Sequence, residues 1–203
     1  MTIARLYAAD TADTSSIHLT PEYRDKLATL LKNVTDFIDE LKIDYWADGG
    51  TLLGAIRNKK HIPWDDDEDL GMDTFDFFKF RKHVNELEKR YNYVIQDQPN
   101  DIIKILDRTA AYVRNTENGG TTDPRYACVD IFHYSYLKKD KKFVLSIPSV
   151  RNTYPNCEYG MTELFPLKEY EYGDLKIKGP QNPVPFLERY YGNWKDQIIY
   201  LYI

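Results

Sequence analysis

Residues 48–72 read DGGTLLGAIRNKKHIPWDDDEDLGM, a glycine turn followed by a run of acidic side chains. The apolar residues 43–47 before the turn are typical of a short strand, and the glycine pair breaks this strand before a helical stretch at 52–57. Alternating side chains over 64–72 then predict a second extended segment. The order strand, glycine turn, helix and strand predicts the centre of an α/β fold.

Further helices and strands are predicted on both sides of this centre. A helix begins at Pro21 after the N-cap Thr20, and apolar residues continue at helical spacing to Leu41. Two more helices are predicted over 74–91 and 185–191. The segments with strand character are 93–95, 102–106, 111–113, 127–136 and 143–147. This mixture indicates an α/β (α+β) protein.

The composition is typical of a folded protein with one domain. The chain has 203 residues, of which 42% are hydrophobic and 29% charged, close to average globular usage. Residues 1–19 show little periodicity and predict an N-terminal arm, whereas residues 20–203 predict a single domain. A net charge of -5 argues against a nucleic-acid-binding protein. The sequence has no long apolar run and no signal peptide, so we expect a cytoplasmic protein with no integral membrane segment.

The acidic run holds five consecutive carboxylates, which repel one another at neutral pH unless a cation lies among them. Successive side chains of an extended chain point to opposite faces, so we expect Asp65, Asp67 and Asp69 on one face. Asp66 and Glu68 are expected on the other face. Carboxylates two positions apart on a strand can share Mg²⁺ or Mn²⁺, because hard divalent cations prefer oxygen ligands. The pattern therefore predicts a metal site.

Two other interpretations of the acidic run are a solvated acidic loop and a Ca²⁺ loop. Leu70 and Met72 favour a strand over a loop, because they carry the alternation into apolar residues. The calcium interpretation is the weaker one, since the spacing lacks the central glycine and distal glutamate of an EF-hand loop.

The turn Asp48-Gly49-Gly50-Thr51 lies between the predicted strand and the predicted helix. Without Cβ atoms in the way, its backbone N–H groups can approach an anion at the helix N-terminus, so we expect Gly49, Gly50 and Thr51 to seat a donor phosphate. Arg57 follows, and its guanidinium is a candidate partner for a phosphate oxygen. The alternatives are a glycine pair that serves only the geometry of a tight turn, and an exposed arginine at a helix end.

A further acid, Asp130, lies inside the apolar run CVDIF at 128–132. An unpaired carboxylate is costly to desolvate, so Asp130 needs a partner, and a metal ion is a suitable one. The alternative is that Asp130 faces solvent from a half-buried strand.

Five segments occur in a fixed order along the chain. They are Gly49-Gly50-Thr51-Leu52-Leu53-Gly54, Ile62-Pro63-Trp64-Asp65, Asp67-x-Asp69, Val129-Asp130-Ile131-Phe132 and Tyr191-Gly192-Asn193-Trp194. Together they resemble the LicD and fukutin-related family over roughly residues 25–195. That family belongs to the nucleotidyltransferase-like superfamily, so the resemblance implies a nucleotidyltransferase-like fold with a small mixed β-sheet flanked by helices.

The resemblance also implies roles for individual residues. Gly49 and Gly50 would form the family's glycine turn. Asp67 and Asp69 would be its metal pair and Asp130 its third carboxylate, with Mg²⁺ or Mn²⁺ as the cofactor. Family members transfer phosphocholine or ribitol phosphate from a CDP-linked donor to a glycan hydroxyl. A metal-dependent phosphotransferase that releases CMP is therefore implied here.

Several alternatives stay open. The same carboxylates would serve a nucleotidyltransferase that releases pyrophosphate, and the same fold would serve a catalytically silent module that binds a nucleotide or a glycan. Asp130 either binds a second metal ion or takes the proton of the acceptor hydroxyl, and Asp65 is a second candidate base.

Overall fold

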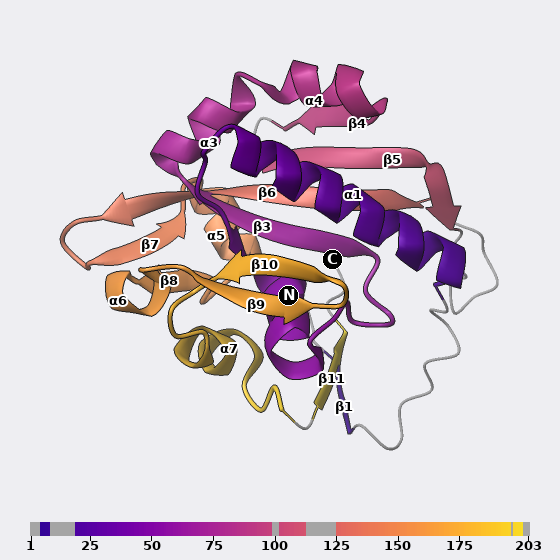
Figure 1. Ribbon diagram of the computed structural model, residues 1–203. Coiled ribbons are helices and arrows are strands. Elements are labelled where there is room, and N and C mark those ends of the chain that lie inside the picture. Colours follow the sequence, from indigo (N-terminus) through magenta and orange to yellow (C-terminus); the bar gives the residue numbers. More distant parts are fainter. Residues whose placement is uncertain (1–4, 9–18, 99–101, 113–124, 196, 201–203) are drawn as a thin grey trace.

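The computed structural model describes residues 5–8, 19–98, 102–112, 125–195 and 197–200. A seven-stranded mixed β-sheet forms the centre of the molecule, and helices pack against it (Figure 1). Its strands are β2 (Trp46–Ala47), β3 (Asp67–Asp73), β4 (Val94–Asp97), β5 (Ile102–Tyr112), β6 (Arg125–Leu137), β7 (Lys142–Leu145) and β8 (Glu158–Gly160). The predicted α/β class with a mixed sheet is confirmed.

Strands β3 and β6 lie side by side in the middle of this sheet. The strand order is β2-β3-β6-β5-β4, with β7 paired to the C-terminal part of β6 and β8 paired to β7. The β3–β6 pair is parallel, and the other pairs of this sheet are antiparallel. This arrangement places Asp67 and Asp69 of β3 next to Asp130 of β6.

Helix α1 (Pro21–Glu40) lies across the sheet and packs on β5 and β6 (Figure 1). Its predicted N-cap is confirmed, because the Thr20 hydroxyl accepts a hydrogen bond from the Tyr23 N–H at 3.1 Å. The apolar residues of its buried face are Leu27, Leu30, Leu31, Val34, Phe37 and Ile38. The helix ends one residue before the predicted end, where Leu41 is the C-cap.

The single helix predicted over 74–91 is wrong, since the structure has two helices, α3 (Thr74–Arg81) and α4 (Val84–Tyr91). The chain turns between them, where the His83 N–H donates to the Phe80 carbonyl at 2.8 Å. Helix α3 packs on β3 and β6, whereas α4 packs on β4 and α1. The apolar residues of α3 and those of α4 therefore pack against different elements, so the chain has to change direction between the two helices.

Several predicted elements have different bounds in the structure. The strand predicted over 43–47 is limited to β2. The segments predicted at 102–106 and 111–113 are parts of the single strand β5, with a register shift between Asp107 and Ala111, and residue 113 lies outside the described part of the chain. The helical stretch after the glycine turn begins earlier than predicted, as α2 (Gly49–Leu53), and continues into a π-helical turn, η2 (Gly54–Asn58).

The last third of the chain adds elements that the sequence did not predict. They include α5 (Pro148–Thr153), strand β8, α6 (Met161–Leu164) and the hairpin of β9 (Lys168–Tyr172) and β10 (Leu175–Gly179). The last predicted helix is confirmed as α7 (Val184–Tyr191), which ends at Gly192 with φ +65.

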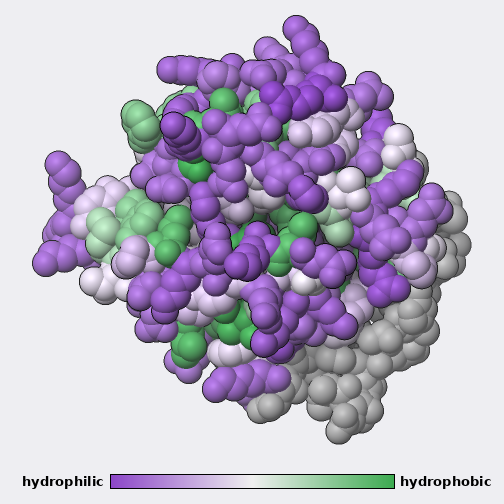
Figure 2. Space-filling model, in the orientation of Figure 1, coloured by the Kyte–Doolittle hydropathy of each residue, from purple (hydrophilic) through white to green (hydrophobic). Residues whose placement is uncertain are grey.

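Of the predicted arm at 1–19, the structure describes β1 (Arg5–Ala8), which pairs antiparallel with β11 (Gln197–Tyr200), and the buried Leu19. The rest of the arm lies outside the described residues, and the division into an arm and a domain at 20–203 stays a prediction. Figure 2 shows that hydrophilic side chains cover most of one face of the molecule, with hydrophobic ones in separate small patches. Among the described residues, no helix combines the length and the apolar character needed to cross a membrane.

Candidate metal centre

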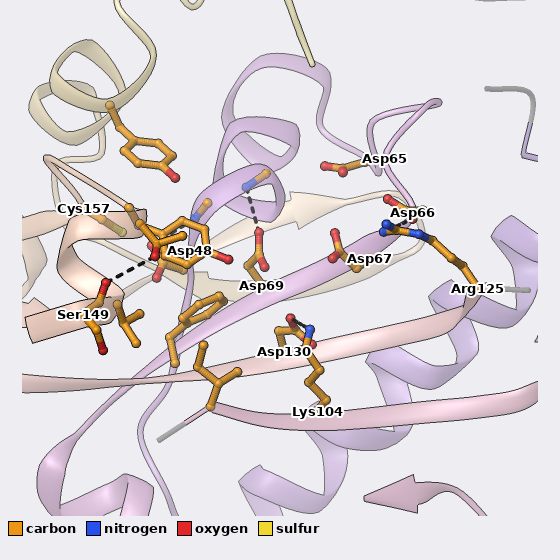
Figure 3. A pocket seen from close by; sticks show the side chains of 18 residues that line it. Asp48, Asp65, Asp66, Asp67, Asp69, Lys104, Arg125, Asp130, Ser149 and Cys157 are labelled. Atoms are coloured by element: carbon orange, nitrogen blue, oxygen red, sulfur yellow. Dashed lines mark hydrogen bonds and ion pairs between the residues drawn. The ribbon is translucent and has the colours of Figure 1, made fainter. Parts of the chain in front are cut away.

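A cavity of about 470 Å³ opens beside the N-terminal end of β3 (Figure 3). The glycine turn, β3, β5, β6, α5 and α7 contribute to its walls. Its charged lining residues are Asp48, Asp65, Asp66, Asp67, Asp69, Lys104, Arg125 and Asp130. Acids outnumber bases among these side chains, so the cavity is suited to hold a cation before it accepts an anionic ligand.

Three of the predicted carboxylates come together in this cavity. Asp69 on β3 is the direct register partner of Asp130 on β6, and Asp67 lies two residues before Asp69 on the same face. One carboxylate oxygen from each of the three residues lies within 4.8 Å of the others. Three convergent carboxylates fit a hard divalent cation such as Mg²⁺ or Mn²⁺, for which Asp67, Asp69 and Asp130 would be the protein ligands.

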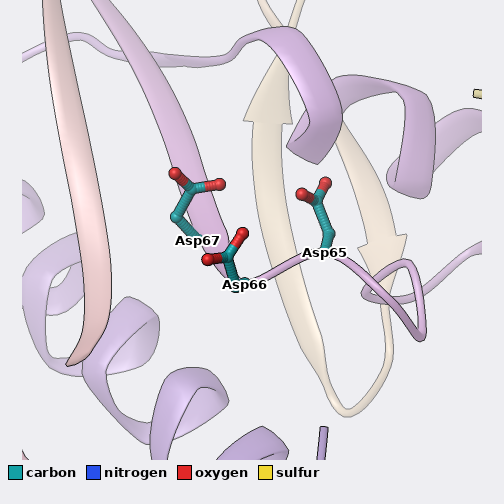
Figure 4. A group of neighbouring side chains, drawn as sticks. All are labelled: Asp65, Asp66 and Asp67. Carbon is teal, nitrogen blue, oxygen red and sulfur yellow. The ribbon is translucent and has the colours of Figure 1, made fainter. Parts of the chain in front are cut away.

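Asp65 and Asp66 lie outside the strand, because β3 begins only at Asp67. The expectation that Asp66 points away from Asp65 and Asp67 is wrong: carboxylate oxygens of all three lie within 4.8 Å of one another (Figure 4). Side chains alternate between two faces only where the chain is extended, and residues 65–66 belong to the loop before β3. Arg125 forms a long ion pair with Asp66, in which a guanidinium nitrogen lies 3.6 Å from a carboxylate oxygen.

Glu68 does point away from the cavity, as predicted, and its side chain is 1% exposed. It accepts hydrogen bonds from the Thr51 hydroxyl at 2.6 Å and from the Tyr172 hydroxyl at 2.7 Å. His61 Nδ1 lies 2.8 Å from Glu68, and His61 Nε2 lies 2.8 Å from the carbonyl oxygen of Asp65. Burial lowers the pKa of His61, but the charge and hydrogen bond of Glu68 outweigh this and the pKa is raised. This buried network fixes the loop that carries Asp65.

Burial raises the pKa of Asp67 and of Asp69 well above the ordinary carboxyl value, and repulsion from neighbouring aspartates raises each pKa further. The pKa of Asp65 is raised to about 7, again mainly by burial. Protons therefore compensate part of the acidic charge when no cation is bound. A divalent cation would displace these protons, which couples metal binding to pH.

Lys104 of β5 is a site residue that the sequence analysis missed. Its ammonium group forms an ion pair with Asp130 Oδ2, and the thiol of Cys128 donates to Asp130 Oδ1 at 2.9 Å. Asp130 is 5% exposed, so it does not face solvent. The expected partner of this buried acid is thus present within the chain, in addition to any metal ion. A lysine inside the apolar run 102–106 was the available signal.

The glycine turn brings the backbone close to the acidic side chains. A Cβ atom on Gly49 would collide with the Asp69 carboxylate, and a Cβ on Gly50 would collide with Asp65. The Gly50 N–H donates to Asp69 Oδ2 at 3.1 Å, and the Gly49 N–H donates to Asp48 at 2.9 Å. The two glycines line the cavity, and a side chain at either position would have to displace the carboxylate that packs against the turn.

Two residues predicted to contact the donor are not among the lining residues of the cavity. Thr51 is 1% exposed, and its hydroxyl also accepts a hydrogen bond from the Asp69 N–H at 2.7 Å, so it supports Asp69 from behind. The Arg57 guanidinium donates to the Trp194 carbonyl at 3.2 Å and to the Asn58 side chain at 2.8 Å. Arg57 therefore links η2 to the Tyr191–Trp194 segment.

Asp48 is a second residue whose role the sequence did not reveal. It is 2% exposed, and its carboxylate accepts hydrogen bonds from the hydroxyls of Tyr134 and Tyr159, both at 2.6 Å. Burial raises the pKa of Asp48, and these hydrogen bonds oppose the rise. Asp48 thereby holds the start of α2 against the aromatic core. The cavity wall on this side includes Tyr154 and Tyr190, which come from the last third of the chain.

A model of the family described as LicD/FKTN/FKRP, nucleotidyltransferase domain, matches residues 42–182 of this chain. An uncharacterized protein of Rickettsia prowazekii is 31% identical over 175 residues, which cover 86% of this chain and 57% of that protein. The lipopolysaccharide cholinephosphotransferase LicD of Haemophilus influenzae is 31% identical over 122 residues, or 55% of this chain and 44% of LicD.

A shorter match joins this chain to the human ribitol 5-phosphate transferase FKRP. The two are 46% identical over 39 residues, which cover 19% of this chain and 8% of FKRP. The chain spans about half the length of the two bacterial relatives that it matches over longer stretches.

Proposed function

This chain belongs to the LicD/FKTN/FKRP nucleotidyltransferase-domain family, and we therefore propose that it is a metal-dependent phosphotransferase. The proposed reaction moves a phospho-alcohol group of the phosphocholine, ribitol phosphate or glycerol phosphate type from a CDP-linked donor to a glycan hydroxyl, and releases CMP. The names of LicD and FKRP, a cholinephosphotransferase and a ribitol 5-phosphate transferase, support the phospho-alcohol class. The observation that carries the proposal is the convergence of Asp67, Asp69 and Asp130 in one cavity.

In the proposed reaction, the oxygen of the acceptor hydroxyl attacks the phosphorus that carries the alcohol. The bond from this phosphorus to the bridging oxygen breaks, CMP leaves with that oxygen, and the hydroxyl proton passes to a carboxylate. Asp67 and Asp69 would hold a divalent cation together with Asp130, and a bound cation would neutralise the charge on the phosphate oxygens.

Asp65 is the better supported of the two candidate bases. Both oxygens of Asp130 already accept hydrogen bonds, one from Lys104 and one from Cys128. Asp65 lines the same cavity from the loop before β3, and burial raises its pKa to about 7, which suits a group that takes up a proton. We therefore assign the acceptor proton to Asp65 and metal binding to Asp130.

The test is a screen of CDP-choline, CDP-ribitol and CDP-glycerol for CMP release, with Mg²⁺ and with a chelator, in the presence and absence of sugar acceptors. We expect CMP from at least one donor, only with the divalent cation, and not from the Asp67→Asn variant. Asp140→Asn, which removes an exposed carboxylate from the turn between β6 and β7, is the matched control and should keep full activity. Equal CMP release with the chelator, or from Asp67→Asn, would contradict the proposal.

The same preparation separates the two rival functions. Release of pyrophosphate from CTP in the presence of an acceptor would indicate a nucleotidyltransferase. Binding of CDP and Mg²⁺ in calorimetry without turnover of any donor would indicate a silent binding module.

A further inference from the structure

Lys104 holds an unusual position in the acidic cavity. It is the register partner of Asp130 on the adjacent antiparallel strand, so the sheet itself fixes the start of its side chain. Its ammonium group pairs with Asp130 Oδ2, at the carboxylate that also belongs to the candidate metal cluster. The Lys104 side chain is 35% exposed and lines the cavity, whereas the Asp130 side chain is 7% exposed.

A divalent cation and this ammonium group would compete for the same carboxylate. Asp130 Oδ1 already accepts a hydrogen bond from the thiol of Cys128, and Oδ2 accepts one from the ammonium group of Lys104. A cation bound among Asp67, Asp69 and Asp130 would share Asp130 with the ammonium group and repel it at short range. The ammonium group of Lys104 sits on a flexible chain of four carbons, so it can move away from Asp130 without any movement of β5.

An anionic donor needs positive charge in a cavity where aspartates predominate. The basic side chains that line it are Lys104 and Arg125, and the Arg125 guanidinium lies 3.6 Å from Asp66. Once displaced from Asp130, the Lys104 ammonium remains inside the same cavity as the donor phosphates. Phosphate oxygens of the donor would then be available to accept its hydrogen bonds.

We propose that Lys104 is an exchangeable counter-ion: it neutralises Asp130 when no divalent cation is bound, and it transfers to a phosphate oxygen of the donor when a cation takes Asp130. The donor half of this proposal rests on the proposed function, whereas the metal half rests only on the ion pair and the carboxylate cluster. Because one side chain responds to both ligands, metal and donor should strengthen each other's binding.

The test is calorimetric titration of the full chain with Mn²⁺, in the absence and presence of CDP, for the wild type, Lys104→Met and Lys104→Arg. Lys104→Met removes the competing cation, so we expect Mn²⁺ to bind about tenfold more tightly without CDP, and CDP to strengthen Mn²⁺ binding less than in the wild type. Lys104→Arg keeps the charge and should bind Mn²⁺ like the wild type. Lys176→Met, which removes an exposed lysine of β10, is the control for a change in net charge.

The possible outcomes distinguish this inference from the proposed function. If the wild type binds Mn²⁺ and Lys104→Met binds it equally or more weakly, the counter-ion role is wrong and the metal site stands. If the wild type binds no Mn²⁺, both fail. Lys104→Met leaves the buried Asp130 without its cationic partner, which could prevent folding. In that case Lys104→Gln provides the same comparison, because it removes the charge and keeps a hydrogen-bond donor.

Discussion

Asp69 of β3 lies directly opposite Asp130 of β6, in the one parallel strand pair of the seven-stranded sheet. Side chains at partner positions of neighbouring strands point to the same face of the sheet, so the backbone ladder alone brings these two carboxylates together. Their separation therefore does not depend on a flexible loop. Substitutions that keep the side-chain shape should leave this geometry intact and change only the charge.

Asp67→Asn and Asp69→Asn should each lower kcat by about 10³-fold or more, because the charge that holds the cation is lost while the shape is kept. The same variants should raise the melting temperature in the presence of a chelator. Burial and repulsion raise the pKa of both carboxyls in the folded protein, so each charge destabilises the folded state when no cation is present.

The measurements for these variants are turnover and thermal melts with and without Mg²⁺. The wild type should gain stability on addition of Mg²⁺, and the variants should gain much less. A variant that melts below the chelator-treated wild type, and is still stabilised by Mg²⁺, would show that Asp67 or Asp69 has a structural role instead.

The local features of the site could be predicted from the sequence because each depends on neighbouring residues. The glycine turn, the acids of β3 and the buried acid Asp130 all follow from short patterns of residue type. The parallel pairing of β3 with β6 does not, since a hydrophobic strand pattern is compatible with several partners and both directions. The resemblance to the family indicated that these segments meet, and the register Asp69 to Asp130 gives the physical reason.

The tertiary contacts of several residues could not be predicted from the sequence. Thr51 and Arg57 were expected at the donor, but their polar atoms bond to Glu68, Asp69 and the Trp194 carbonyl. Lys104 was missed for the converse reason: a single lysine in an apolar strand has no meaning until its partner on the adjacent strand is known. Side chains that support a site from behind leave no short sequence pattern.

Asp76→Asn should stabilise the protein above pH 6 and have little effect near pH 4. Burial and the nearby Asp73 and Asp44 raise the pKa of Asp76 to about 6 in the folded state, above the unfolded value. The unfolded chain therefore releases this proton at lower pH than the folded chain, and the folded state loses stability as pH rises through 6. Paired melts of wild type and variant from about pH 4 to pH 7 check this, and a constant difference across that range would contradict it.

Thr51→Val should lower the unfolding free energy by about 1–3 kcal/mol, because it removes the acceptor of the Asp69 N–H and one of the hydrogen bonds to the buried Glu68 carboxylate. Glu68 keeps its hydrogen bond from the Tyr172 hydroxyl, so most of the loss is expected to come from the Asp69 N–H. Thr51→Ser keeps the hydroxyl and should retain most of the stability. Urea denaturation measures the loss. If Thr51→Val instead raised the KM for the donor with no loss of stability, Thr51 would contact the donor, as its place in the glycine turn first suggested.

Gly49→Ala and Gly173→Ala form a matched pair that separates backbone strain from the close approach of a carboxylate. Gly49 has φ +46 and Gly173 has φ +60, so each alanine should cost about 1–2 kcal/mol of stability from the left-handed backbone. A Cβ on Gly173 meets nothing within 4 Å, whereas a Cβ on Gly49 runs into the Asp69 carboxylate. Gly49→Ala should therefore also lose Mn²⁺ affinity and about 10²-fold in turnover, since a metal ligand is displaced. Equal turnover for both variants, measured by CMP release, would show that Asp69 tolerates the added methyl group and that the glycine serves only the turn.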